Sequence, residues 1–272
     1  MATVRPPAVA GSFYPGNANA LQSVVREHLG DARKSSSSGS SWPKALIAPH
    51  AGFMYSGSVA ARAFVTLEPG SDVIHRVVLL GPSHHVPFGG LAVPSSTAFE
   101  TPLGPVPIDE TARRHVLELP FVHILDDAHH WEHSLEVQLP FLQEVIEAFS
   151  LLPIAVGRAT PSQVRQVLDA VWGGDETVIV ISSDLSHYHD YETARGMDVA
   201  TANAIEQLEP ERIEYQDACG RIGVQGLLQA AKDRALAVET LDLRSSGDTA
   251  GGRSQVVGYG AWAFTVSKSG SP

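Results

Sequence analysis

Three short apolar runs, each followed by a histidine or a carboxylate, set the strongest limit on how this chain can fold. The runs cover residues 45–48, 77–80 and 178–181. Continuous apolar runs of this length are typical of strands that are buried on both faces. His50, His84 and Asp184 follow the three runs within a few residues. Because ligands bind beyond the carboxyl ends of strands in open α/β sheets, we expect a functional site where these ends meet.

Helical segments alternate with strands along the rest of the chain. Helices are predicted to Leu29 and over 58–67, 109–119, 136–149, 161–172, 192–208 and 220–232, and further strands over 91–93, 121–125, 150–156, 238–243 and 256–264. This alternation favours an α/β fold in which a mixed or parallel sheet is flanked by helices. No internal repeat is visible, so one domain over residues 1–272 is expected, with residues 35–43 as a flexible surface loop.

The composition excludes several classes of partner. A formal charge of −11 argues against binding to nucleic acid or to an anionic membrane, because both need a positive field. No apolar run approaches the roughly 20 residues of a membrane-spanning helix, and the N-terminus lacks the design of a signal peptide. The single cysteine, Cys219, fits a reducing compartment. We therefore expect a cytoplasmic protein whose ligand is a small molecule or a peptide.

Histidines are frequent, with twelve in the chain, and several lie in clusters. A lone histidine after a strand, such as His50, more often satisfies a nearby backbone carbonyl than binds a ligand. The adjacent pair His84 and His85 shifts the balance toward a site. Because successive residues of an extended chain point in opposite directions, one of the pair would face the pocket and the other would face away. The pattern leaves open which of the two faces inward.

Other polar groups have both a functional and a structural interpretation. His187 could act as a general acid or base, and Asp184 could fix a histidine tautomer or cap a helix that begins just after it. His133 and Glu136 have the i, i+3 spacing of metal-binding helices, which solvated pairs share. His129 and His130 have no spacing that favours ligation. Cys219 precedes a helix start, where a thiol can be activated, although a small buried apolar role is commoner.

A glycine-rich loop over residues 245–254 carries one carboxylate, Asp248. Such a loop can supply a metal ligand or an anion-binding nest, whereas an Asx-turn is the commoner use. Two strand-end histidines with this carboxylate would form the facial triad suited to non-haem Fe(II), with positions open for O₂ and substrate. The same set could bind Zn²⁺ and activate water. A metal-free module that binds a peptide or a small anion in the same cleft is the alternative from another class.

Six stretches of the chain resemble the Memo family, whose prokaryotic members are called AmmeMemoRadiSam system protein B. They are RPPAVAGSFYPGN, APHAGFMYSG, LLGPSHH, EHSLEVQLPFLQ, SSDLSHY and SSGDTAGGRSQVVGYGAWAF, spread from Arg5 to Phe264. The family is similar in fold to the class III extradiol ring-cleavage dioxygenases. In those enzymes two histidines and a carboxylate bind Fe(II), and another histidine assists proton transfer and O₂ chemistry.

The resemblance implies metal ligands at His50 and His84 and an acid or base at His187, with Asp184 beside it. Asp248 falls where animal Memo carries a cysteine ligand. A carboxylate at this position favours Fe(II) over thiolate-based copper binding, with Zn and Cu as further possibilities. The implied function is that of a metal-binding protein, and more narrowly a non-haem iron oxidoreductase or dioxygenase.

The resemblance also selects His84 as the inward member of its pair. It leaves His85 as a group of the pocket wall or behind the ligands, together with His133 and Glu136. Animal Memo is described both as a metal-binding protein with redox and signalling roles and as a phosphopeptide-binding adaptor. The implied binding module and the implied enzyme would therefore use the same cleft.

Overall fold

A nine-stranded mixed sheet forms the centre of the computed structural model, which describes residues 3–35 and 41–266. Its strands are β2 (Ala45–Ala48), β3 (Arg76–Pro82), β4 (Leu91–Val93), β7 (Val122–Ile124), β8 (Ser150–Val156), β9 (Thr177–Ser182), β10 (His187–His189), β11 (Leu236–Ser245) and β12 (Val256–Val266). They lie in the order β10-β12-β2-β9-β3-β8-β4-β7, and β11 pairs with β12. The predicted α/β fold with a mixed sheet flanked by helices is confirmed.

The four central strands β2, β9, β3 and β8 are parallel, whereas β12 runs antiparallel to β2, and β4 runs antiparallel to β8 but parallel to β7. In the register of β2 and β9, Ala48 lies opposite Ser182. Every residue of these two strands is buried, as the apolar runs predict. The carboxyl ends of β2, β9 and β3 therefore lie side by side at one edge of the sheet.

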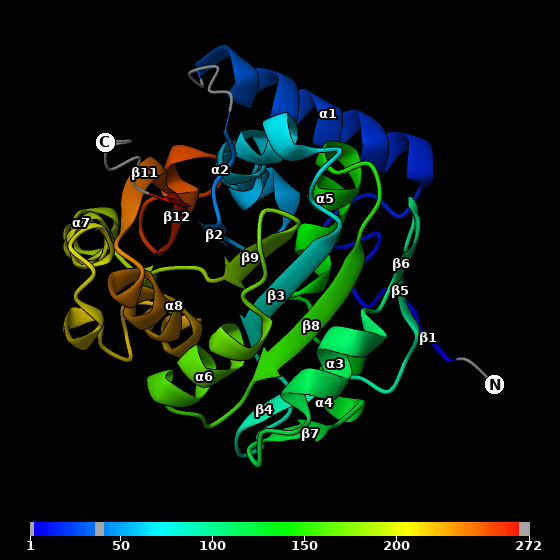
Figure 1. Cartoon of the computed structure of the whole chain (residues 1–272). Helices are drawn as coiled ribbons and strands as arrows, with labels where there is room; N and C mark the ends of the chain where they lie inside the picture. The colour runs from blue at the N-terminus through cyan, green and yellow to red at the C-terminus, as the bar shows by residue number, and fades with distance from the viewer. Residues whose placement is uncertain (1–2, 36–40, 267–272) are drawn as a thin grey trace, which may run out of the picture.

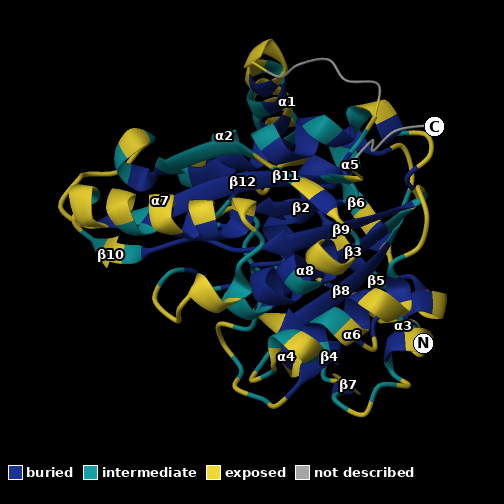
Figure 2. Cartoon of the chain, turned by 60° about the vertical axis from the view of Figure 1, so that its left-hand side comes forward, coloured by how far each residue is buried: buried dark blue, intermediate teal, exposed yellow. Residues whose placement is uncertain are grey.

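Helices cover both faces of the sheet (Figure 1). The first face carries α1 (Ala18–Ser35), α2 (Phe53–Phe64) and α5 (Leu139–Val145), and the second carries α3 (Glu110–Val116), α6 (Pro161–Val171), α7 (Tyr191–Glu206) and α8 (Arg221–Asp233). Alternate residues of each central strand contribute to the two cores: Leu79 packs on the first face and Val78 and Leu80 on the second. Figure 2 shows the buried sheet between helices whose outer sides are exposed.

A second, three-stranded sheet joins the N-terminal segment to the middle of the chain. It consists of β1 (Val4–Arg5), β5 (Ala98–Thr101) and β6 (Gly104–Pro107), in that order. The proline-rich composition of this region gave no sign of these strands. Short elements complete the fold: α4 (Asp127–His130), η1 (Val65–Gly70), η2 (Glu136–Gln138), η3 (Pro210–Arg212) and η4 (Ser246–Asp248).

The structure corrects two expectations for local elements. The predicted helix over 136–149 is a 3-10 turn, η2, followed by the short α5. Pro140 lies in the first turn of α5, the part of a helix that tolerates a residue without an N–H, so the α-helix begins at Leu139. Of the two interpretations of Asp184, the helix cap is wrong, because no helix begins just after it: residues 183–186 are irregular and lead into β10.

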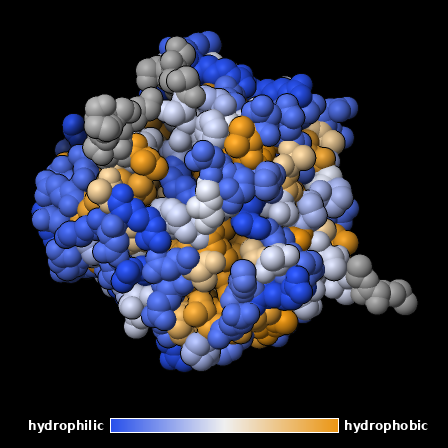
Figure 3. Space-filling model, viewed as in Figure 1, coloured by the Kyte–Doolittle hydropathy of each residue, from blue (hydrophilic) through white to orange (hydrophobic). Residues whose placement is uncertain are grey.

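The predicted loop over 35–43 is described only at its two ends, because residues 36–40 lie outside the described part of the chain. Ser35 ends α1, and Trp42 packs against the core of the first face. Within residues 3–35 and 41–266, no helix combines the length and the apolar character that crossing a lipid bilayer requires. On the side seen in Figure 3, hydrophilic side chains cover most of the surface, with smaller apolar patches between them.

Candidate metal centre

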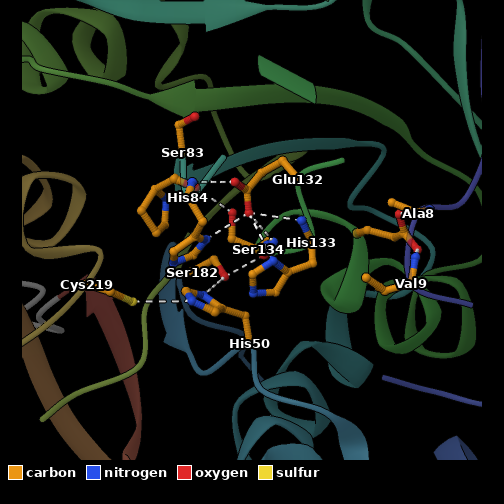
Figure 4. A network of polar contacts seen from close by, with 12 residues as sticks. Ala8, Val9, His50, Ser83, His84, Glu132, His133, Ser134, Ser182 and Cys219 are labelled. Carbon is orange, nitrogen blue, oxygen red and sulfur yellow. Dashed lines mark hydrogen bonds and ion pairs between the residues drawn. The ribbon is translucent and has the colours of Figure 1, made fainter. Parts of the chain in front are cut away.

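The carboxyl ends of β2, β9 and β3 bring three sequence-distant histidines together (Figure 4). His50 follows β2, His84 follows β3, and His133 precedes η2. One ring nitrogen from each histidine lies within 4.8 Å of the other two. His50 is buried, His133 is half-buried and His84 is exposed, so the group opens to the surface on the His84 side. The strand ends thus lie together as expected, and His133 joins His50 and His84 there.

The hydrogen bonds around Ser182 fix the tautomer of His50. The Ser182 hydroxyl donates its proton to the carbonyl of Ser134 at 2.6 Å and accepts from the Gln138 amide at 2.8 Å. Its remaining contact is to His50 Nδ1 at 2.8 Å, so that nitrogen must be the donor. The lone pair of His50 therefore lies on Nε2, the nitrogen left for a ligand.

A buried carboxylate, Glu132, orients His84. Its oxygens accept the backbone N–H of His84 at 2.6 Å and His84 Nδ1 at 2.9 Å. They also accept the backbone N–H groups of His133 and Ser134, both at 2.9 Å. Because Nδ1 of His84 faces a carboxylate, it carries the proton and leaves Nε2 free. A carboxylate behind a histidine is the arrangement that fixes ring orientation in many metal sites.

His133 lies between the other two rings and the N-terminal segment. Its ring stacks on His84 with centroids 4.7 Å apart and meets His50 edge-on at 5.6 Å. The Phe13 ring also packs against it, with centroids 4.8 Å apart. Aromatic packing on this ring limits its rotation, so the third nitrogen is also held in place.

Burial keeps two of the three histidines neutral. Burial first, and then the nearby charge of His84, lowers the pKa of His50 to about 3. Burial and the charge of His50 lower the pKa of His133 to about 4. For His84, burial also acts to lower the pKa, but the hydrogen bond and the charge of Glu132 outweigh it and raise the pKa above its usual value. Neutral imidazole is the form that binds metal, so His50 and His133 are ready ligands at neutral pH.

Asp184 and His187 lie next to this group. Asp184 is buried, and its Oδ1 accepts the backbone N–H of His50 at 2.7 Å. Burial is the main cause that raises the pKa of Asp184, and the charge of His187 acts against it. His187 Nδ1 donates to the carbonyl of Leu185 at 2.7 Å, which leaves its Nε2 as the acceptor. The next residue, Tyr188, has a φ of 61°, an uncommon backbone conformation that is enriched at functional sites.

Asp248 lies outside the group of three histidines in the described structure. Its Oδ1 accepts the Tyr191 hydroxyl at 2.6 Å, and its Oδ2 accepts the backbone N–H and the hydroxyl of Ser245 at 2.9 and 3.0 Å. Arg253 lies 3.9 Å from it and stacks on the Tyr191 ring. In this arrangement Asp248 attaches its loop to α7, and its role as a ligand stays a prediction.

The other two expected pocket residues differ in position. The His85 ring lies 6.0 Å from the His133 ring and carries no ligand atom of the group. Glu136 is fully buried and binds the N-terminal segment: it pairs with Arg5 and accepts the Tyr14 hydroxyl at 2.5 Å. It also accepts two backbone N–H groups of that segment, at 2.7 and 3.0 Å. Glu136 therefore supports the wall of the site from behind.

Two contacts of the site had no clear signal in the sequence. Glu132 is the residue next to His133, and only its position in a histidine-rich stretch could have drawn attention to it. The Cys219 sulfur lies 3.3 Å from His50 Nε2, although the sequence favoured a small apolar role for this residue. Burial raises the pKa of the Cys219 thiol, so it carries its proton in the metal-free protein.

The donor set fits a transition-metal ion. Three imidazoles whose Nδ1 atoms or ring faces are held by neighbours offer the ligand type that Zn, Cu, Fe and Ni prefer. A carboxylate-rich site would instead suit Mg²⁺ or Ca²⁺. Of the three histidines, His84 is the exposed one, so solvent reaches the group on its side. The residues present thus fit a transition-metal site with three protein ligands.

Glu132→Gln is expected to weaken metal binding by about 10- to 100-fold, the usual cost of losing a group behind a histidine ligand. The amide keeps the size of Glu132 but removes the charge that orients and polarises His84. Competition with a chromophoric chelator would measure the affinity. Glu118→Gln, at an exposed position, is the matched control and should leave the affinity unchanged. Equal affinities for the two variants would show that Glu132 does not act on the ligand.

Comparison with known proteins gives a consistent result. The family model described as Memo-like protein matches residues 5–263. A MEMO1 family protein of Aquifex aeolicus (strain VF5) is 38% identical over 267 residues, which cover 94% of this chain and 97% of that protein. MEMO1 family proteins of Aeropyrum pernix and Ignicoccus hospitalis are 35% and 34% identical and cover 95% and 97% of this chain and 98% and 99% of their own lengths. All the residues of the metal centre lie inside the matched region.

Proposed function

The chain belongs to the Memo-like protein family, and we propose that it is a non-haem iron oxidoreductase that binds Fe(II) between His50, His84 and His133. One observation carries the proposal: the ligand nitrogens of these three histidines converge within 4.8 Å. The Nδ1 protons of His50 and His84 are donated to Ser182 and Glu132, so the lone pair of each ring lies on Nε2. Fe(II) at this position would supply electron transfer to O₂.

The neighbouring residues support proton transfer beside the metal. His187 has a free Nε2, and its charge acts on both His50 and Asp184, so it is placed to take or give a proton near the ligands. Asp184 holds the backbone of His50 and thereby fixes the position of that ligand. Asp248 would join the ligands only after releasing Tyr191 and Ser245. We propose His187 as the acid or base and Asp184 as the residue that positions His50.

We propose that the substrate is a small molecule or a peptide that approaches from the exposed His84 side. The formal charge of −11 disfavours nucleic acid and anionic membrane as partners. A reducing, cytoplasmic location would keep both the iron and Cys219 reduced. Dioxygenase activity is the narrower form of this proposal, because the same chemistry uses an open position for O₂ next to the substrate.

The presence of a third histidine also favours a second candidate, Zn²⁺-dependent hydrolysis. Three histidines with one open position are a ligand set of catalytic zinc sites, in which the ion lowers the pKa of a bound water. Copper is a third option for imidazole ligands. Metal content after anaerobic purification distinguishes the candidates, because only the iron and copper forms can exchange electrons with O₂.

Nitric oxide, a stand-in for O₂, provides the test. Protein loaded anaerobically with Fe(II) is expected to bind nitric oxide and give an electron paramagnetic resonance signal, because the site has open positions. The loaded protein should also consume O₂ faster than the same concentration of free Fe(II), and His187→Gln should change the pH profile of that rate. Iron that binds without a nitric oxide signal would contradict the proposal, as would a site that holds only zinc.

A further inference from the structure

The thiol of Cys219 is hydrogen-bonded to the same nitrogen of His50 that would bind a metal. Its sulfur lies 3.3 Å from His50 Nε2, as the dashed line in Figure 4 shows. Since Nδ1 of His50 is the donor to Ser182, Nε2 has only a lone pair, and the thiol must donate to it. In Figure 4 Cys219 approaches His50 from the side away from His133. The proposed function assigns no role to this contact.

The backbone around Cys219 is fixed to the end of β9. The backbone N–H of Cys219 donates to the carbonyl of Asp184 at 3.2 Å. The N–H of Gly220 donates to the Ser183 hydroxyl at 3.0 Å. A Cβ on Gly220 would lie 2.6 Å from the carbonyl oxygen of Ser182, so only glycine allows this close approach. The thiol is therefore held at the site by the segment after β9 that also contains Asp184.

The separation of the two atoms matches that of two ligands on one ion. With bond lengths of about 2.0–2.1 Å to nitrogen and about 2.3 Å to sulfur, tetrahedral geometry places N and S about 3.6 Å apart. The observed distance of 3.3 Å is close to this value. An ion bound to His50 Nε2 would thus lie within bonding distance of the sulfur. The ion must therefore either bond to the sulfur or displace it. The sulfur is not among the ligand atoms that lie within 4.8 Å of one another, so bonding to a shared ion requires the thiol to rotate toward these three nitrogens.

We propose that Cys219 is a fourth protein ligand of the metal centre, bound as a thiolate after its proton leaves to solvent. The inference rests on the proposed metal site and goes beyond it by adding a sulfur donor to the three imidazoles. A thiolate favours soft or borderline ions such as Fe²⁺, Co²⁺, Zn²⁺ and Cu⁺ over Mg²⁺ and Mn²⁺. Four protein ligands still leave positions for exogenous ligands on a five- or six-coordinate Fe(II).

Cobalt(II) tests the inference, because a thiolate bound to this ion gives a charge-transfer band in the near ultraviolet that imidazole does not. Cys219 is the only cysteine of the chain, so any such band reports this residue alone. The wild-type protein with Co²⁺ is expected to show the band together with the visible ligand-field bands. Cys219→Ser should keep the ligand-field bands, lose the charge-transfer band, and bind Co²⁺ at least about tenfold more weakly. Cys219→Ala, checked for folding by circular dichroism, should give the same spectrum.

The possible outcomes separate this inference from the proposed site. Ligand-field bands without a charge-transfer band in the wild-type protein would overturn the role of Cys219 and leave the three-histidine site intact. Tighter Co²⁺ binding by Cys219→Ser would show that the thiol competes with the metal, which also overturns it. Absence of every cobalt band in the folded wild-type protein would overturn both the inference and the proposed metal site.

Discussion

Replacing His50 with alanine is expected to remove metal binding from a protein that still folds. His50 supplies the most buried of the three ligand nitrogens, and its ring is fixed by Ser182. Without it, only two of the three histidine ligands remain. The affinity for the metal should therefore fall by more than about 100-fold, which exceeds the usual loss when a residue that hydrogen-bonds a ligand is removed. Metal analysis after dialysis and competition with a chelator would measure the effect. His84→Ala should behave in the same way.

His130→Ala is the control for this prediction, because His130 is exposed and lies outside the group of three. It should retain the wild-type metal content and affinity. Thermal unfolding of each variant would confirm that the chain is folded. Full metal binding by folded His50→Ala protein would show that the ion lies somewhere other than between these histidines.

Replacing Glu136 with alanine is expected to destabilise the protein by about 3–5 kcal/mol, which is the usual cost of removing one partner of a buried ion pair. The carboxylate is fully buried and holds four groups of the N-terminal segment, among them Arg5 and Tyr14. In the variant the Arg5 guanidinium would stay buried without its counter-charge. Urea unfolding followed by circular dichroism would measure the loss of free energy of unfolding.

A control is Asp31→Ala, which removes an ion pair to Lys34 in which both side chains are exposed. Exposed pairs contribute about 0–1 kcal/mol, so this variant should unfold almost as the wild-type protein does. Phe13 belongs to the segment that Glu136 holds, and it packs on His133, so Glu136→Ala should also weaken metal binding. A loss below about 1 kcal/mol for Glu136→Ala would contradict the anchoring role.

The sequence was sufficient to predict the strand ends that form the site. Continuous apolar runs identify buried parallel strands, and the carboxyl ends of such strands meet by geometry, so the neighbourhood of His50, His84 and Asp184 followed from pattern alone. The choice between His84 and His85 did not follow, because it depends on how the chain turns after β3. In the structure the backbone N–H and the Nδ1 of His84 both bind Glu132. These two hydrogen bonds orient the His84 ring toward His50 and His133.

Contacts between distant segments could not be predicted in this way. His133 joins the group because the segment before η2 packs against the end of β9, where Ser182 donates to the carbonyl of Ser134. The i, i+3 spacing had instead suggested that His133 and Glu136 act together, yet Glu136 binds the N-terminal segment. Periodicity reports which face of an element is buried and carries no information about which other segment covers it. The contact of Cys219 with His50 is of the same kind, since 169 residues separate the two.

Anomalous diffraction would show directly whether a metal ion binds between His50, His84 and His133. Crystals of protein loaded anaerobically with Fe(II), measured on both sides of the iron absorption edge, are expected to show one anomalous peak about 2.0–2.2 Å from a ring nitrogen of each histidine. A peak bound by Asp248 without His133 would contradict the three-histidine centre. The absence of any anomalous peak near the three rings would contradict the metal site itself.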